Sequence, residues 1–149
     1  MPFPRVAGLL FILLMVSAAA ASERQLIVNV YVDDTASKKA LVVGHVDDPQ
    51  SLSLLKTSEE LYEENGQFYA VANSILTEEG DGWRLEFPVQ GYYDEYHAVF
   101  YIPGGYELTQ INSSQGLELL TSRYNGSLIL DVQGSEVQEP EVTIRYRAS

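Results

Sequence analysis

Apolar and polar positions alternate with a period of two in short segments that recur from residue 25 to residue 147. The clearest segments are QLIVNVYVD, WRLEFPV and EVTIRYR, which begin at residues 25, 83 and 141. In the first of them every second residue is apolar: Leu26, Val28, Val30 and Val32. Because successive side chains of a strand point to opposite faces, this pattern predicts β-strands with one buried face.

Turn signals divide these segments. Asn65-Gly66 and Asn125-Gly126 are dipeptides that tolerate the positive φ angles of tight hairpin turns, and Pro88, which has no backbone N–H, indicates a strand end or an edge. The sequence therefore predicts an all-β fold, an antiparallel sandwich of about nine strands. Residues 51–62 are the one helical competitor, where we expect no more than a short turn, and residues 113–124 have room for one helical turn.

The predicted core consists of side chains on the apolar side of alternating strands. Six of them should be largely buried: Trp83, Phe87, Phe100, Leu130, Val132 and Ile144. On this prediction, replacement of Trp83 by Ala costs about 3 to 5 kcal/mol of stability.

Residues 1–22 have the composition of a secretory signal peptide. Arg5 is followed by an uncharged apolar run from Ala7 to Ala21 that ends in three small alanines. A membrane-spanning helix needs about 20 apolar residues, so the shorter run predicts a signal that is removed, with the mature N-terminus close to residue 22. The alternative is an uncleaved N-terminal membrane anchor. Either way, residues 23–149 are expected to form a single β-sandwich domain outside the cytoplasm, secreted or at the cell surface.

Charge and cysteine content exclude several classes of function. Residues 23–149 contain 8 basic and 21 acidic residues, a net charge of −13. Nucleic acid and anionic membrane surfaces both require cationic patches, so neither is an expected partner. The chain has no cysteine, which excludes disulfides, thiol chemistry and thiolate metal sites and leaves stability to the core.

The stretch GYYDEYHAVFYIPGGY, residues 91 to 106, carries the candidate binding residues. If Phe100 and Ile102 point into the core, strict alternation places four polar or aromatic side chains together on the opposite face: Tyr93, Glu95, His97 and Tyr101. Phenols, a carboxylate and an imidazole are suited to bind a sugar or a short peptide. The alternative is a half-buried strand whose outward side is merely polar and aromatic.

Catalysis and metal binding have little support in the sequence. No nucleophile, zinc or phosphate-loop motif is present, and nothing in the sequence brings His45 and His97 together. A carboxylate-pair hydrolase needs no spacing motif and stays open. Pairing of residues 25–33 with 38–47 would set Asp33 and Asp47 at opposite ends of a hairpin, which disfavours a shared calcium site, and the acidic loop 78–82 is more typical of a solvated turn. We expect no metal and no cofactor.

Two glycosylation triplets are present, NSS at Asn112 and NGS at Asn125. Both fall in predicted loops, where an exported chain would expose them.

The order of several segments resembles a known family. They are ALVVGHVDDPQSLSLL, YDEYHAVFYIP, INSSQGLELL, SLILDVQG and VTIRY. They resemble the extracytoplasmic β-rich domain, of uncharacterised function, of archaeal membrane proteins, many of which continue through one transmembrane helix into a cytoplasmic winged helix-turn-helix domain. The resemblance covers about residues 25–147 and rests on packing and turn residues. Because the chain stops at RYRAS, we expect either a free-standing exported domain or a truncated chain.

These observations predict a non-enzymatic, extracytoplasmic domain of binding or sensing type at an archaeal cell surface, with an unknown surface ligand or envelope protein as partner. The alternative is a structural or adhesive envelope component, and a glycan-acting hydrolase comes third. An exposed apolar patch on the outer sheet would favour assembly, whereas a concave patch around the four candidate residues would favour ligand binding.

Overall fold

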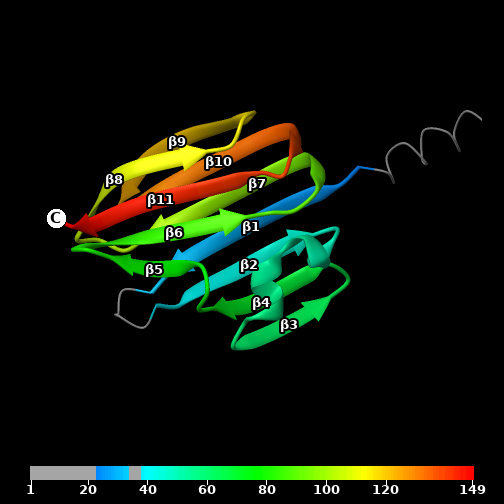
Figure 1. Cartoon of the computed structure of the whole chain (residues 1–149), viewed down its shortest axis with the longest axis horizontal. Helices are drawn as coiled ribbons and strands as arrows, with labels where there is room; N and C mark the ends of the chain where they lie inside the picture. The colour runs from blue at the N-terminus through cyan, green and yellow to red at the C-terminus, as the bar shows by residue number, and fades with distance from the viewer. Residues whose placement is uncertain (1–22, 34–37) are drawn as a thin grey trace, which may run out of the picture.

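Strands account for most of the described chain (Figure 1). The computed structural model describes residues 23–33 and 38–149. The expected export signal, residues 1–22, and the middle of the first hairpin turn, residues 34–37, lie outside the described residues. The described elements, in chain order, are β1 (Gln25–Val32), β2 (Ala40–Val46), the 3-10 helices η1 (Pro49–Ser51) and η2 (Ser53–Lys56), β3 (Glu60–Glu64), β4 (Gln67–Ala72), β5 (Leu76–Glu79), β6 (Gly82–Pro88), β7 (Tyr92–Ile102), β8 (Tyr106–Ser113), β9 (Leu117–Tyr124), β10 (Ser127–Gln138) and β11 (Glu141–Ala148).

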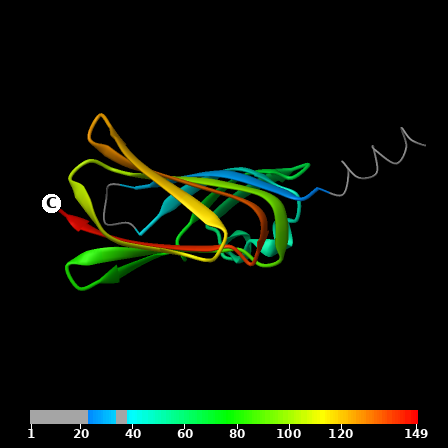
Figure 2. The same cartoon turned by 90° about the horizontal axis from the view of Figure 1, so that it is seen from above.

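The strands form two sheets that pack as a sandwich (Figure 2). The seven-stranded sheet has the order β3-β4-β2-β1-β7-β10-β9, and the four-stranded sheet has the order β5-β6-β11-β8. Every described pair is antiparallel except β1 with β7, which is parallel. The predicted all-β sandwich is confirmed, with eleven described strands in place of about nine.

The two additional strands are β5 and β9. The segment that begins at Gln67 is divided into β4 and β5, which belong to different sheets. The helical turn allowed for residues 113–124 is absent, because Leu117–Tyr124 pairs with β10 along its whole length. Pairing along a neighbouring strand outweighs the weak local preference of the Leu-rich sequence for helix. In residues 51–62 the structure has only 3-10 turns before β3 begins, as predicted.

Both predicted Asn-Gly turns are present. Asn65 and Gly66 join β3 to β4 with φ angles of 52° and 82°, and Asn125 and Gly126 join β9 to β10 with 50° and 83°. Positive φ at both central residues is the geometry whose twist matches that of the paired strands, and Asn and Gly adopt it at low cost. These two turns fix the registers of their hairpins.

The core lies between the sheets and consists of the side chains that alternation predicted, with one exception. Phe87, Phe100, Leu130, Val132 and Ile144 are fully buried. Trp83 is half-buried and packs against the edge of this core. It is the second residue of β6, beside the turn that joins β5 to β6 at the end of the sheet, so the opposite layer covers it incompletely. The prediction that Trp83 is largely buried was therefore wrong, because the side chain is only half-buried. Trp83 does lie on the core side of its strand, as the alternation predicted.

Phe87 should contribute more to stability than Trp83. The Phe87 ring packs edge-on against Phe100, with the ring centroids 5.6 Å apart, and it is inaccessible to water. Phe87→Ala is expected to lower the free energy of unfolding by about 3 to 5 kcal/mol, because it leaves a buried cavity that the surrounding side chains fill only in part. Trp83→Ala should cost less, because part of the ring is already hydrated. Urea unfolding of both variants would test this order, and a larger loss for Trp83→Ala would contradict it.

Candidate functional site

The outer face of the seven-stranded sheet, the surface that points away from the four-stranded sheet, is the candidate site. The strand registers align its side chains in rows that run across all seven strands. Its large apolar and aromatic members are Ile27, Tyr31, Leu41, Val43, Tyr62, Tyr69, Val71, Val99, Tyr101, Leu120, Tyr124 and Ile129. We refer to this surface as the outer face.

Apolar exposure in the described chain is concentrated on the outer face. Six of the eight exposed large hydrophobic side chains belong to it, and the most exposed are Leu120 at 70%, Tyr124 at 69% and Tyr62 at 63%. Single exposed apolar residues are ordinary, but a group of them on one face of a sheet is rarer on a monomeric protein and marks a candidate interaction surface. This is the exposed apolar patch that the sequence analysis set as the criterion for assembly.

A stacked pair of tyrosines stands on the two central neighbours β1 and β7, near one end of the outer face. The rings of Tyr31 on β1 and Tyr101 on β7 are parallel to within 10°, with centroids 4.6 Å apart. The Tyr101 hydroxyl donates a hydrogen bond of 3.3 Å to Oδ1 of Asn29. Partial burial, followed by the neighbouring Tyr31 and Asp131, raises the pKa of Tyr101, so the phenol stays protonated at neutral pH.

Three of the four candidate binding residues lie on the outer face, but Tyr93 does not. Glu95, His97 and Tyr101 point outward, whereas the Tyr93 side chain is fully buried. The reason is a bulge: the N–H groups of Asp94 and Glu95 both donate to the carbonyl of Arg24, at 3.0 and 3.1 Å. An extra residue in the ladder reverses which side chains face inward, so the predicted placement of Tyr93 was wrong.

Strand β10, which pairs with β7, is irregular at the same position along the sheet. Glu136 has a positive φ of 52°, and the register lacks a partner pair between Ser135 with Glu95 and Val137 with Tyr93. Val137 is buried, although strict alternation from Val132 would point it outward. Both strands therefore change which face their side chains occupy at one position along the sheet.

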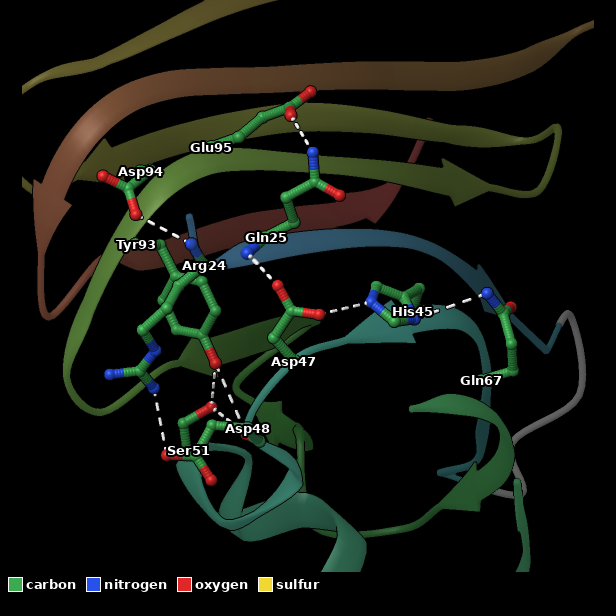
Figure 3. Close-up of polar contacts among 10 residues, drawn as sticks. All are labelled: Arg24, Gln25, His45, Asp47, Asp48, Ser51, Gln67, Tyr93, Asp94 and Glu95. Atoms are coloured by element: carbon green, nitrogen blue, oxygen red, sulfur yellow. Dashed lines mark hydrogen bonds and ion pairs between the residues drawn. The ribbon is translucent and has the colours of Figure 1, made fainter. Parts of the chain in front are cut away.

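Tyr93 belongs to a polar cluster that joins the start of β1 to the 3-10 turns (Figure 3). Its hydroxyl is hydrogen-bonded to Oγ of Ser51, which in turn donates to the Asp48 carbonyl at 2.6 Å. The guanidinium of Arg24 lies 4.9 Å from the centre of the Tyr93 ring and 3.0 Å from the Asp48 carboxylate. Tyr93 is thus a packing and anchoring residue, with no surface for a ligand.

The two histidines share the outer face. His45 on β2 and His97 on β7 both lie beside Ile27 of the intervening strand β1. Each is paired with a carboxylate, His45 Nε2 with Asp47 at 2.6 Å and His97 Nε2 with Asp131 at 2.9 Å. This arrangement could not be predicted from the sequence, because it depends on β1 lying between β2 and β7. The only signal in the sequence was that each histidine lies on the outward side of its own alternating strand.

Asp47 is held in its ionised form. Partial burial alone would raise its pKa, but hydrogen bonds from the Gln25 N–H and from His45, with the charges of His45 and Arg24, outweigh burial and lower it (Figure 3). The Gln25 N–H lies 2.7 Å from the carboxylate. This contact joins the end of β2 to the start of β1.

Two of the depressions on the outer face lie at its opposite ends, and neither contains all the candidate residues. The larger, about 610 Å³, is bordered by Glu95 and His97 together with the carboxylates of Glu23, Asp94 and Glu118. The other, about 350 Å³, is bordered by Tyr31 and Tyr101. Neither depression therefore brings the four candidate residues together.

Other predicted sites are placed as follows. Asn125 is exposed in the β9–β10 turn, as expected, whereas Asn112 is exposed on strand β8 and not in a loop.

The β1–β2 hairpin places Asp33 and Asp47 at opposite ends, as predicted. In residues 23–33 and 38–149 no three His, Asp or Glu side chains are arranged to hold a metal ion, and no helix there is long and apolar enough to cross a membrane.

No family model, curated protein or solved structure matches the chain.

Tyr93 should be required for folding. Tyr93→Ala removes a buried ring and is expected to cost about 3 to 5 kcal/mol. Tyr93→Phe keeps the ring and loses only the hydrogen bonds of the hydroxyl, with Ser51 and with the Asp48 carbonyl, so it should cost about 0.5 to 1.5 kcal/mol for each bond lost. Denaturant unfolding measures both values. Equal stability of wild type and Tyr93→Ala would contradict the buried placement.

Acid should weaken the contact between β1 and β2. Because folding lowers the pKa of Asp47, its contribution is present above the ordinary carboxyl pKa and is lost as the pH falls through the lowered value. Asp47→Asn should therefore unfold more easily at neutral pH and show less loss of stability in acid than the wild type. Urea midpoints measured between about pH 2 and 7 would test this, with Asp81→Asn, a change in an exposed turn, as the matched control.

Proposed function

We propose that this chain is an exported, non-enzymatic binding domain that docks an envelope protein on the outer face of its seven-stranded sheet. The observation that carries the proposal is the apolar surface that spans all seven strands. Burying it against a partner would recover the hydrophobic free energy that folding leaves unused.

The composition of the outer face supports a protein partner. Interface cores are enriched in aromatic residues and depleted in charge, with charged residues at the rim. Five tyrosines lie on the outer face, and the carboxylates of the larger depression lie at one end of it. With strands about 4.8 Å apart, a seven-stranded sheet is on the order of 30 Å wide, which is sufficient for an interface of standard size.

A sugar fits the tyrosine pair less well. Sugar rings stack on the open faces of aromatic side chains, but Tyr31 and Tyr101 cover each other's inner faces. The neighbouring side chains on the outer face, Leu41, Val43 and Val71, are apolar and cannot form hydrogen bonds with the hydroxyl groups of a sugar. Both features favour an apolar protein surface over a carbohydrate.

The second candidate is a structural or adhesive envelope component. The same outer face would then pack against copies of the chain, as the assembly criterion requires. The two candidates differ in the occupant of one surface, so self-association of the purified protein that depends on the outer-face tyrosines separates them. Export, and an archaeal cell surface as the location, rest on the N-terminal sequence and the family resemblance.

Removing two exposed rings should abolish docking. Tyr31→Ser with Tyr69→Ser deletes side chains that are 41% and 43% exposed without adding charge. Since aromatic contacts in interface cores are commonly worth more than 1 kcal/mol each, affinity for isolated native cell envelopes should fall about tenfold or more. Co-sedimentation of labelled protein with the envelopes measures this affinity.

Leu61→Ser is the matched control, because Leu61 is 46% exposed and lies on the opposite side of its strand from the outer face. It should bind as the wild type does. Equal binding by the double variant would refute the proposal. Loss of a self-associated state of the purified protein, with envelope binding unchanged, would favour the structural candidate.

A further inference from the structure

The four edge strands of the sandwich differ in how they are protected against pairing. An edge strand offers unpaired backbone groups to any extended segment, and proteins block such edges with charge, shortness or bulges. Strand β3 contains three glutamates in five residues, and β5 has four residues, two of them glutamates. Strand β8 has an irregular register against β11.

Strand β9 has none of these protections. All eight of its residues pair with β10 in an unbroken register, so its far edge has no bulge. It carries one acidic and one basic residue, Glu118 and Arg123, and is locally neutral in a strongly acidic chain. Figure 2 looks onto this edge, and no other element lies in front of β9.

The exposed side chains of β9 are mostly apolar. Leu120 is 70% exposed and Tyr124 is 69% exposed, the two highest values among the large hydrophobic residues of the described chain. They lie four residues apart on the outer face. Leu119, 37% exposed, points to the other side of the strand.

We propose that two copies of this chain pair antiparallel through the free edges of β9, with Ser122 opposite Ser122 of the second copy. In this register Leu120 of each copy lies directly opposite Tyr124 of the other. A leucine facing an aromatic ring is a stabilising cross-strand pair. The two-fold axis therefore produces two identical Leu120–Tyr124 pairs, in which the two most exposed apolar side chains cover each other.

Geometry and charge both favour a second copy as the occupant. Pairing of even-numbered with even-numbered residues keeps outward side chains opposite outward ones, as a regular ladder requires. The two-fold axis closes the assembly at two copies. Each copy has a net charge of −12 to −13, and β9 is the neutral edge at which like charges repel least.

The pairing has a consequence for the proposed docking function. A two-fold axis perpendicular to the sheet joins the two seven-stranded sheets edge to edge and turns both outer faces to the same side. A dimer would then bind a surface with two sites in place of one and gain avidity. A single strand pair buries less than about 1,200 Å², so we expect a weak dimer that forms with rising concentration.

Sedimentation of the purified chain, residues 23–149, tests the pairing. The mass should rise from one copy towards two between about 1 µM and 1 mM, the range of weak complexes. Leu120→Lys should remain monomeric over this range. Tyr62→Lys, which changes a 63% exposed residue of the outer face at the opposite edge, should dimerise as the wild type does. Urea midpoints confirm that both variants fold.

Cysteine substitution tests the register, because the chain has no cysteine of its own. Ser122→Cys should form a disulfide-linked dimer under mild oxidation at least tenfold faster than Ser53→Cys, an exposed serine on η2. The double variant Leu120→Lys/Ser122→Cys should form the disulfide no faster than Ser53→Cys does. Equal rates for the two cysteine variants would overturn the proposal. So would a dimer that Tyr62→Lys disrupts and Leu120→Lys does not, which would place the contact on the outer face.

Discussion

The parallel pairing of β1 with β7 is the contact on which the rest of the sheet depends. It places β1 in the centre of the seven-stranded sheet, between its hairpin partner β2 and strand β7, beyond which lie β10 and β9. The pairing begins with a bulge, in which the carbonyl of Arg24 accepts two consecutive N–H groups from β7. The bulge decides which side chains of β7 enter the core and which reach the surface. Tyr93 is drawn inward, and Glu95, His97 and Tyr101 are left outside.

Most strands could be predicted because alternation and turn chemistry are local. The Asn-Gly turns need only two residues, and the apolar side of β1 is evident from four residues in alternation. The placement of Tyr93 could not be predicted, because the bulge depends on a carbonyl that is 70 residues away in sequence. The arrangement of His45 and His97 around Ile27 required the strand order, which no local pattern specifies. Strand β9 was missed because its partner, and not its own composition, keeps it extended.

The apolar outer face is a cost that the domain carries without disulfides to offset it. Stability comes from the single core between the sheets, from Leu26 on β1 to Ile144 on β11. Hydrophobic burial on the outer face would add to that stability only when a partner is bound. A domain of this kind is therefore expected to be more stable in its complex than alone, which links docking to folding.

The net negative charge of the chain opposes association through its exposed apolar surface. The excess of acidic residues makes separate molecules repel each other, and salt at 0.1 M ionic strength screens this repulsion beyond a distance of about 10 Å. Repulsion acts on every approach, but it is weakest where a surface has no net charge. In the seven-stranded sheet the edge β3 is acidic and the edge β9 is neutral, so the charge pattern selects one edge for contact and protects the other. An acidic chain with one neutral, regular edge thus avoids random aggregation while keeping a single defined direction of association.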